Sequence, residues 1–498
     1  MKQPLSQKVL LSASASTVSL TSRFFVQILL ARLLGPQGMG QVAYITWLAE
    51  ITSVLFSFSL PSTLTKFLAE LRGAGSEKHV PVIARWIYVR YVVLLLFGAT
   101  ALSFYLIWVY DPVCDLFLVL IAGMLLMAKG LESLNSSYLS GRERFDTLAR
   151  INLTGSIVLL VAVAFFGYLL KVKGAVLGYL AGAMVPAACS LLFFRQKSVH
   201  EIDSSLVERI YKFAIYSWLS LLISTLIWSR TEIFFIDRYW GSAAVGIFTV
   251  GLTFSSIVQQ ASGLLSGAFM AHFSNLVGAG DKDTINRHYR IATTFVAMFS
   301  VPMAFMGAAV MPQLLPIFFG RAFEGAVESA MVLILPSALS FSFIGSSLVY
   351  ANERADFIFL GGLAGALMSV SAGFLIIPKY GVLGAAWSRL IIHTAMIFLG
   401  TWFIWRVLGF SFPFRSLFII SLASVISATC AFGVSLSHVR EVLKLAFSLA
   451  IGLGVYLLAI KTLRLLGQEE KEAFKLILAK LPSPLGKNFE RCLEWLAR

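Results

Sequence analysis

The chain has 498 residues, of which 58% are hydrophobic and 13% charged, and its formal net charge is +15. Soluble domains average about 45–50% apolar and about 25% charged residues, so the composition excludes an ordinary soluble globular protein, and the aromatic content excludes a disordered one. The four cysteines, Cys114, Cys189, Cys430 and Cys492, form no close pair in the sequence and predict neither a disulfide framework nor a zinc site.

Long apolar runs follow one another from end to end, and each is long enough to cross a membrane as a helix, which takes about 20 residues. The sequence therefore predicts an all-α integral membrane protein. Charged residues, Gly and Pro separate the runs and predict fourteen transmembrane helices, at 9–34, 40–68, 84–109, 114–138, 151–170, 175–195, 213–239, 243–273, 290–318, 325–350, 356–377, 382–406, 415–437 and 441–464.

The distribution of Lys and Arg orients these helices. An even number of helices puts both termini on one side, and the segments on that side carry 27 Lys and Arg residues, against 8 on the other side. Cytoplasmic segments carry the excess of positive charge in membrane proteins. We therefore expect a multi-pass protein of the cell inner (plasma) membrane with both termini in the cytoplasm. The net charge reflects this bias, and no nucleic acid is expected as a partner.

The chain contains an internal duplication. The pattern RxxGxxxxG at Arg32–Gly40 recurs at Arg238–Gly246, 206 positions later. SSYLSGRERFD at Ser136–Asp146 recurs as SSLVYANERAD at Ser346–Asp356, 210 positions later, and the patterns LxGAG and KxxVLG recur at offsets of 205 and 206. Matches in the same order at nearly constant offset indicate a duplicated unit of six helices.

The duplication predicts the domain organisation. A unit with an even number of helices re-enters the membrane from the same side, so the two copies are expected to be parallel repeats. We expect an N-terminal six-helix bundle at 1–212, a C-terminal six-helix bundle at 213–407, helices 13 and 14 at 408–465, and a cytoplasmic amphipathic tail at 466–498. The tail is expected either to lie on the membrane surface or to be a solvated helix.

The glycines of the repeated RxxGxxxxG pattern are expected to be structural. Gly35 and Gly40, like Gly241 and Gly246, lie where one predicted helix ends and the next begins. Glycine permits a tight turn there that a residue with a Cβ would strain. The repeated ERxD motif, at the inner ends of helices 4 and 10, is expected to make cytoplasmic charge contacts.

Helix 1 carries a polar stripe. Ser12, Ser16, Ser19, Arg23 and Gln27 follow one another at spacings of three or four residues and therefore lie on one face. A stripe that includes Arg and Gln favours a helix that lines a hydrated cleft. The alternative is a seam of small residues that packs against another helix.

Further ionisable residues lie inside predicted helices, where each costs about 2.5–3.5 kcal/mol on insertion scales. Lys129 and Glu132 have the spacing of a same-helix ion pair, so a structural role and a ligand role stay open. Arg230 lies about 120° off the face of helix 7 that carries Ser217, Ser220 and Ser224, at 100° per residue. It faces the cleft or, instead, lipid headgroups or another helix. Arg389 and His393, four residues apart in helix 12, either pack or line the path.

Cations outnumber carboxylates among these residues, which favours an anionic cargo, because guanidinium pairs well with diphosphate. We expect a cationic substrate-binding cleft formed by Arg23, Gln27, Arg90, Lys129, Arg230 and Arg389. Glu50, Glu132 and Glu232 are the candidates for coupling to H⁺ or Na⁺. The sequence holds no Walker A loop, no HExxH motif and no GxSxG motif, so we expect no enzyme, no catalytic residue, no metal and no cofactor.

The segment ARLLGPQGMGQVAY at Ala31–Tyr44, which follows the polar first helix, resembles the polysaccharide-transporter branch of the multidrug/oligosaccharidyl-lipid/polysaccharide exporter (MOP) superfamily. Fourteen helices in duplicated halves fit this branch, and the resemblance covers essentially the whole chain. It implies an O-antigen-type flippase, which moves undecaprenyl-diphosphate-linked oligosaccharide from the inner to the outer leaflet of the cytoplasmic membrane by alternating access. It also implies work in the biosynthesis of lipopolysaccharide O-antigen or exopolysaccharide, beside membrane lipids and other polysaccharide assembly proteins.

Three alternative functions stay open from the sequence. The first is a lipid II flippase of the same superfamily, with a similar cationic cleft. The second is a drug/cation antiporter, against which the absence of a carboxylate in helix 1 weighs. The third is a membrane glycan polymerase or ligase, which usually needs a large polar loop that this chain lacks.

Overall fold

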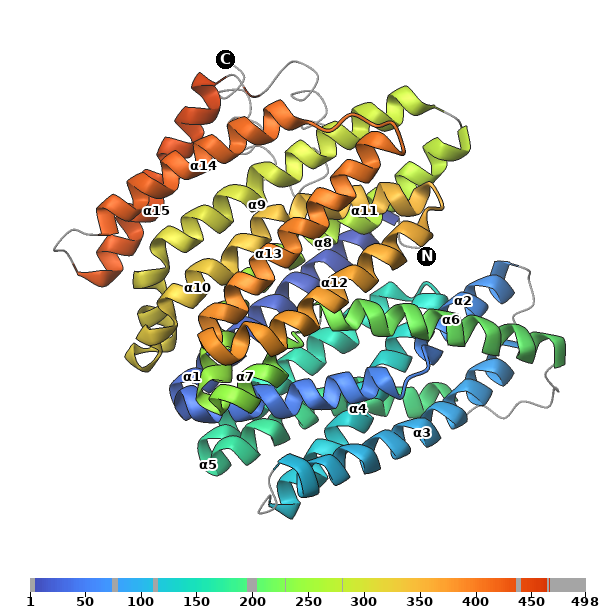
Figure 1. Ribbon diagram of the computed structural model, residues 1–498. Coiled ribbons are helices and arrows are strands. Elements are labelled where there is room, and N and C mark those ends of the chain that lie inside the picture. The colour runs from blue at the N-terminus through green and yellow to red at the C-terminus, as the bar shows by residue number, and fades with distance from the viewer. Residues whose placement is uncertain are drawn as a thin grey trace. The chain divides into compact units, whose positions relative to one another are not determined.

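The structure is a computed structural model that describes residues 5–73, 79–110, 115–194, 204–228, 230–279, 281–435, 440–463 and 465. Over these ranges the chain is helical, without strands (Figure 1). The predicted all-α fold class is confirmed. The predicted tail at 466–498, Cys114 and Cys492 lie outside the described residues, while Cys189 and Cys430 are free thiols.

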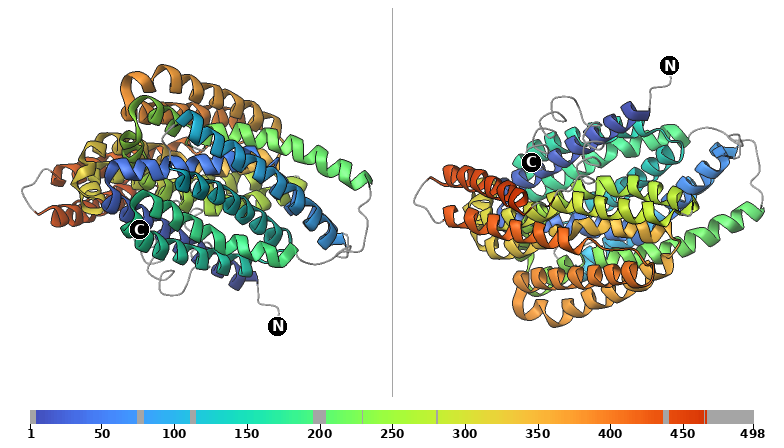
Figure 2. Two further views of the ribbon diagram at one scale, coloured as in Figure 1. Left: turned by 90° about the horizontal axis from the view of Figure 1, so that it is seen from below. Right: turned by 90° about the horizontal axis from the view of Figure 1, so that it is seen from above.

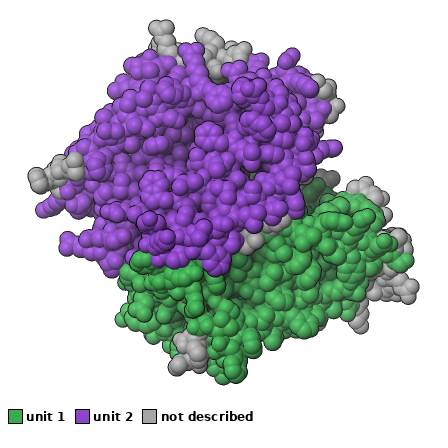
Figure 3. Space-filling model, in the orientation of Figure 1, with its two compact units in different colours: residues 1–246 green, residues 247–498 purple. Residues whose placement is uncertain are grey.

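Residue contacts divide the chain into two units, Met1–Gly246 and Ile247–Arg498 (Figure 3). The first unit contains α1 (Leu5–Leu55), α2 (Leu60–Gly73), α3 (Val80–Tyr105) with a π-helical extension (Leu106–Tyr110), α4 (Leu116–Gly141), α5 (Phe145–Phe194), α6 (Ser204–Trp228) and α7 (Glu232–Trp240). The next helix, α8 (Ser242–Ala279), begins in the first unit and continues into the second.

The second unit continues with α9 (Lys282–Phe319), a 3₁₀ turn (Arg321–Ala326), α10 (Val327–Ile334), a second 3₁₀ segment (Leu335–Phe341) and α11 (Ser342–Ala351). It ends with α12 (Ala355–Leu375), α13 (Ile377–Arg406), α14 (Phe414–Ser435) and α15 (Glu441–Thr462). The sequence repeat predicts that the first bundle ends at residue 212, whereas the first unit defined by residue contacts ends at Gly246. The unit extends further because α6, which follows residue 203, packs on α2.

Each predicted transmembrane range overlaps helical structure, but the helices do not correspond one to one. Among the described residues, eleven helices are long and apolar enough to cross a membrane. Two of them, α1 and α5, each hold more than one predicted range. The count of fourteen crossings therefore stays a prediction.

Backbone breaks explain how single long helices hold two predicted ranges. A straight helix of the 51 residues of α1 would be about 75 Å long, more than twice the hydrocarbon core of a membrane. Gly35, with φ 65° and ψ −174°, breaks α1, and Lys171, with φ 53° and ψ −127°, breaks α5. Both residues lie between predicted helices, as the charge and glycine punctuation of the sequence indicates.

The duplication is visible in the backbone. Gly35 and Gly241, which are equivalent in the repeat, both have positive φ, 65° and 78°. Glu143 and Glu353, equivalent in the second repeated segment, have φ values of 53° and 58°, although such values are uncommon for residues other than glycine. In both copies the amide after the glutamate donates to the carbonyl five residues back. The two copies therefore end their fourth helix with the same turn.

The repeated ERxD motif makes different charge contacts in the two copies. Arg72 of α2 forms an ion pair with Glu143 at 2.9 Å, which ties the α4–α5 turn to α2. In the second copy Arg354 pairs with Asp356 of the same motif at 3.0 Å. All four side chains are at least one-third exposed, so each pair contributes little to stability.

The predicted helix 2 is interrupted between α1 and α2. Phe58 and Ser59 have positive φ, 44° and 53°, and the helical hydrogen bonds are lost there. Trp218 of α6 donates from its indole Nε1 to the carbonyl of Leu55 at 2.9 Å and stacks on Phe58 with ring centroids 4.5 Å apart. Because no water is present inside a bilayer to satisfy a free carbonyl, this indole bond stabilises the break.

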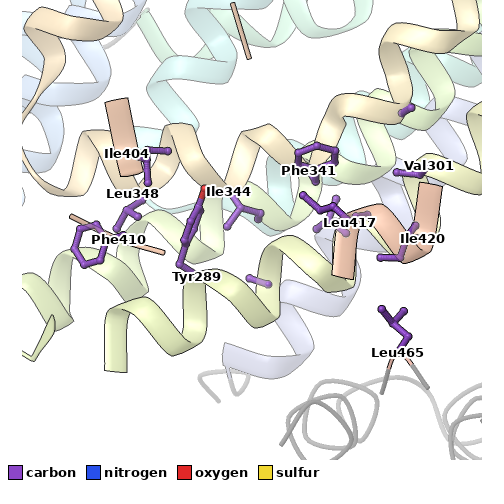
Figure 4. Packing of buried hydrophobic residues seen from close by; sticks show 14 of the residues in the cluster. Tyr289, Val301, Phe341, Ile344, Leu348, Ile404, Phe410, Leu417, Ile420 and Leu465 are labelled. Atoms are coloured by element: carbon purple, nitrogen blue, oxygen red, sulfur yellow. The ribbon is translucent and has the colours of Figure 1, made fainter. Parts of the chain in front are cut away.

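A continuous hydrophobic core holds the second unit together. Tyr289 of α9, Ile344 and Leu348 of α11, and Ile404 of α13 are almost fully buried in one cluster (Figure 4). The antiparallel pair α14 and α15 packs beside α9 (Figures 1 and 2). Large apolar side chains such as Phe398, 71% exposed, also cover outward faces, as expected of helices that face lipid.

Candidate functional site

The polar stripe of α1 faces α5. The hydroxyls of Ser19 and Ser156 lie 2.9 Å apart, and Gln27 donates from Nε2 to the hydroxyl of Tyr179 at 3.3 Å. Arg23, between these two contacts, is exposed. The stripe therefore serves in part as the packing seam that was the alternative interpretation, while its arginine stays accessible. The side chains of Ser12 and Ser16 lie outside the description.

Tyr179, in the second half of α5, gathers the ionisable residues of the first unit. Besides accepting the bond from Gln27, it lies within electrostatic range of Arg23, Glu50 and Arg230. These five residues, Arg23, Gln27, Glu50, Tyr179 and Arg230, are called the Tyr179 cluster below. They come from both halves of α1, from α5 and from the segment between α6 and α7.

The helical wheel misplaced Arg230, because the predicted helix 7 is not continuous. The helix α6 ends at Trp228 and α7 begins at Glu232, and Arg230 between them has φ 63°. The offset of about 120° assumed regular helix rotation through this point. The break turns Arg230 to within electrostatic range of Tyr179.

Lys129 and Glu132 of α4 form an ion pair, with Nζ and Oε2 2.9 Å apart. Both side chains are 24% exposed, so solvent screens the pair less than a surface pair. The charges neutralise one another, and Lys129 and Glu132 are not among the residues found near Tyr179. The geometry favours the structural role that the spacing left open.

Arg90 lies apart from the Tyr179 cluster. It is exposed on α3, where its guanidinium carbon lies 3.7 Å from the centroid of the Trp86 ring. Its Nε donates to the hydroxyl of Tyr211 of α6 at 3.2 Å. A lipid-facing site near one end of these helices suits this arginine better than the predicted cleft.

Arg389 and His393 lie in α13 of the second unit and are almost fully buried, 5% and 4% exposed. The two side chains lie within electrostatic range of one another. Their burial matches the packing role that the sequence left open.

The three candidate carboxylates differ in their surroundings. Glu132 is paired with Lys129, and Glu232 is 7% exposed at the first residue of α7, where a carboxylate interacts favourably with the helix dipole. Glu50 is exposed and lies in the Tyr179 cluster. Within the described ranges, no group of three or more His, Cys, Asp and Glu side chains could hold a metal ion.

The repeated glycines have two roles. Gly35 and Gly241 adopt positive φ at turns. Gly40 and Gly246, in contrast, lie inside α1 and α8, where their Cα atoms pack against the backbone of the other copy of the pattern. Sequence reasoning expected all four at turns, because it could not see that the two copies meet.

The Tyr179 cluster can bind an anion. Its arginines, Arg23 and Arg230, outnumber its single carboxylate, Glu50, and the amide of Gln27 and the hydroxyl of Tyr179 add neutral hydrogen-bonding groups. Arginine presents its donors in a fixed fork that matches phosphate oxygens. The sequence prediction did not include Tyr179, because it named ionisable residues and the polar residues that lie in line with them on a helix. A tyrosine within an otherwise apolar helix was the available signal.

A family model described as "Polysaccharide biosynthesis protein" matches residues 29–328. The chain belongs to this family. The match covers both repeated RxxGxxxxG segments and three of the five residues of the Tyr179 cluster, Glu50, Tyr179 and Arg230. The other two, Arg23 and Gln27, lie just before residue 29. No match is found among curated proteins.

Solved structures of transporters share the fold of this polysaccharide biosynthesis protein. The lipid II flippase MurJ, in an inward closed conformation, matches with a TM-score of 0.75 at 14% identity, over 90% of this chain and 98% of MurJ. An inward-facing multidrug resistance MATE family transporter of the MOP superfamily matches with a TM-score of 0.61 at 13% identity, over 79% of this chain and 97% of that one. The predicted polysaccharide family is confirmed, the fold is shared with these transporters, and the chain is a multi-pass membrane protein.

Proposed function

We propose that the chain is a flippase that moves a lipid-linked oligosaccharide, with undecaprenyl diphosphate as its carrier, from the inner to the outer leaflet of the cytoplasmic membrane. Membership of the polysaccharide biosynthesis family supports the substrate class, and the fold of MurJ and MATE transporters supports transport in place of catalysis. The duplicated six-helix unit supports alternating access as the mechanism. The lipid tail stays in the bilayer while the diphosphate and the sugars cross.

The observation that carries the proposal is the Tyr179 cluster. Ionisable side chains inside a membrane are expensive, and they persist where they face a polar path or a partner. Here Arg23 and Arg230 converge on one tyrosine from segments that are far apart in sequence. A diphosphate provides negative charge and pairs of phosphate oxygens that a guanidinium group binds through two parallel hydrogen bonds. The hydroxyl and amide groups are suited to the sugar next to it.

We further propose Glu50 as the carboxylate that couples transport to H⁺ or Na⁺. It is the candidate that lies in the Tyr179 cluster, whereas Glu132 is neutralised by Lys129. A coupling site must sense whether substrate is bound, and a position within electrostatic range of Tyr179, as for the two arginines, provides this link. The substitution Glu50→Gln is expected to remove the dependence of transport on the ion gradient.

A lipid II flippase is the second candidate, and the structural match to MurJ favours it. Its cargo also carries a diphosphate, so the Tyr179 cluster serves it equally well. A drug/cation antiporter fits less well, since predicted helix 1, residues 9–34, contains Arg23 and Arg32 but no carboxylate for an organic cation.

Deletion of the gene tests the proposal. The expected result is loss of surface polysaccharide with accumulation of lipid-linked oligosaccharide in the inner leaflet. A block in peptidoglycan synthesis with accumulated lipid II would identify the second candidate. Unchanged surface polymer with increased drug sensitivity would contradict the proposal and support the antiporter.

A further inference from the structure

The helices α2, α3 and α6 meet at one end of the first unit, near the C-terminus of α2 and the N-termini of α3 and α6. Trp86 and Arg90 lie in the first three turns of α3, and Arg209 and Tyr211 lie in the first two turns of α6. Trp and Tyr concentrate at membrane–water interfaces, because their rings are apolar at one end and polar at the other. Their presence here places this end of the helices at headgroup depth. The charge bias of the sequence assigns it to the cytoplasmic leaflet.

Contacts between α6 and α2 fix the position of α6. Arg209 of α6 forms an ion pair with Glu70 of α2 at 2.8 Å. One turn away, the rings of Phe213 and Phe67 pack edge to face with centroids 6.2 Å apart, and the Nζ of Lys66 lies 3.9 Å from the centroid of Phe213. The carboxylate of Glu70 is therefore engaged by Arg209. These contacts hold Tyr211, on the same stretch of α6, against α3.

Arg90 is held by two aromatic side chains. Its guanidinium stacks on Trp86 at 3.7 Å, its Nε donates to the hydroxyl of Tyr211 at 3.2 Å, and the two rings pack edge to face at 5.4 Å. These contacts fix the orientation of the guanidinium before any ligand arrives. They involve Nε and one face of the group, and Nη1 also donates to the carbonyl oxygen of Trp86 at 3.4 Å. The N–H groups of Nη2 and the second N–H of Nη1 remain available.

The charge of Arg90 has no carboxylate partner within 4.0 Å in the part of the chain that the structure describes. The side chain is exposed, and exposed neighbours on α3 such as Val89 and Val93 are apolar. A positioned guanidinium on a lipid-facing surface at headgroup depth calls for an anion supplied by the membrane. Phosphate oxygens match the remaining N–H donors of this guanidinium best.

We infer that Arg90, Trp86 and Tyr211 form a binding site for the phosphate of an anionic lipid headgroup in the cytoplasmic leaflet. The site is separate from the Tyr179 cluster. It takes either the diphosphate of the lipid-linked substrate, before that substrate reaches the cluster, or the phosphate of a bulk anionic phospholipid. The first source rests on the proposed function, whereas the second does not.

Lipid binding to the purified full-length protein in detergent tests the site, with native mass spectrometry as the readout. The probes are dioleoylphosphatidylglycerol, dioleoylphosphatidylcholine and undecaprenyl diphosphate. The variant Arg90→Ala is expected to lose about tenfold in affinity for the anionic lipids, as removal of a charge-assisted hydrogen bond does. Arg90→Lys is expected to lose less, because the charge stays while the fork is lost.

Arg85→Ala is the matched control. Arg85 is exposed one to two turns away on α3, and the described residues show no hydrogen bond, ion pair or ring contact for it. Arg85→Ala removes the same charge from a residue that has no aromatic contacts. The affinity of this variant for the anionic lipids is expected to stay within about twofold of the parent, as for a screened surface charge. Tyr211→Phe keeps the ring, removes the hydroxyl, and is expected to give an intermediate loss. Thermal unfolding of each variant identifies any that fail to fold, and Arg90→Lys and Tyr211→Phe then carry the test.

The outcomes separate the sources. Arg90-dependent binding of both anionic lipids identifies a general phospholipid-phosphate site, and Arg90-dependent binding of undecaprenyl diphosphate alone identifies a substrate site. Equal losses for Arg90→Ala and Arg85→Ala would overturn the inference in favour of non-specific charge. Displacement of lipid by inorganic phosphate at matched concentration would overturn the lipid assignment. None of these measurements depends on transport, so the inference can fail while the proposed function stands.

Discussion

Gly40 and Gly246 meet at a backbone contact with no room for a side chain. A Cβ on Gly40 would overlap the carbonyl oxygen of Ser242 and lie 2.6 Å from its carbon. A Cβ on Gly246 would overlap the carbonyl oxygen of Pro36 and lie 2.9 Å from its carbon. The contact is reciprocal, because Pro36 and Ser242 are also equivalent positions of the repeat. The RxxGxxxxG pattern therefore joins its own two copies, between α1 and the first turns of α8.

This contact predicts that Gly40→Ala and Gly246→Ala each destabilise the protein by about 1–3 kcal/mol, as overpacking does. Because one separation of the two backbones relieves both clashes, the double variant is expected to lose less than the sum of the single losses. Thermal unfolding in detergent measures both effects. Gly433→Ala in α14 is the control, since a Cβ there meets nothing within 4 Å, and its Tm is expected to stay or rise slightly. Unchanged unfolding temperatures for both single variants would contradict the contact.

The Lys129–Glu132 ion pair predicts that single variants of these residues are less stable than the double variant. Removing one partner leaves a half-buried charge without compensation, so Lys129→Gln or Glu132→Gln alone is expected to destabilise by about 1 kcal/mol or more. The double variant removes both charges and is expected to be closer to the parent in unfolding temperature and to retain transport. Complementation of surface polysaccharide at matched protein level provides the second measurement. A double variant that is stable but inactive would show that the pair takes part in transport.

Asp281 provides a pH-dependent contribution to stability at the start of α9. Hydrogen bonds from the side chain and the backbone N–H of Thr284, the latter at 3.0 Å, lower the pKa of its carboxyl below the ordinary value. A lowered folded-state pKa means that the contribution is complete above the unfolded pKa of about 3.9 and disappears as the pH falls through the folded value. Asp281→Ala is expected to lower Tm at pH 7.

The difference in Tm between Asp281→Ala and the parent is expected to shrink as the pH falls below about 4. Asp281→Asn keeps an acceptor for the capping bond and is expected to lose less in Tm than Asp281→Ala at pH 7, and this loss also shrinks as the carboxyl of the parent becomes protonated. Unfolding curves of the three proteins across this pH range give the comparison. A constant difference for Asp281→Ala at all pH values would refute a contribution from the charged form.

The charge bias predicts the sidedness of the chain. In a variant without Cys114, Cys189, Cys430 and Cys492, single cysteines introduced at 71–80 or 198–206 are expected to react with an impermeant thiol reagent only from the cytoplasm. Cysteines at 171–174, where Lys171 breaks α5 and is exposed, are expected to react only from outside. The opposite pattern would reverse the orientation and with it the assigned direction of transport.

The sequence was sufficient for features that depend on local pattern. The helical ranges followed from apolar length, and the duplicated turns at Glu143 and Glu353 followed from the repeated motif. The direction of Arg230 was predicted wrongly, because a helical wheel assumes a regular helix. An arginine in the sequence does not indicate that the backbone has a positive φ there. Tyr179 and the meeting of Gly40 with Gly246 were missed for another reason. They depend on contacts between segments distant in sequence, which periodicity does not encode.

The same limit affected Arg90 and the pair of Arg389 with His393. In sequence all of them are polar residues in apolar runs. Only packing distinguishes an exposed arginine held by Trp86 and Tyr211 from one that is buried in α13. The predicted cationic cleft therefore included arginines whose surroundings in the fold differ.

The most direct test of the account is complementation of surface polysaccharide in the deletion strain by variants of Arg23, at matched protein abundance. Arg23→Ala is expected to abolish complementation, and Arg23→Lys to retain part of it, because the charge remains while the fork for the diphosphate is lost. Arg415→Ala, an exposed arginine at the start of α14, is the control and is expected to complement fully. Full complementation by Arg23→Ala at normal abundance would contradict the role of the Tyr179 cluster in binding the diphosphate.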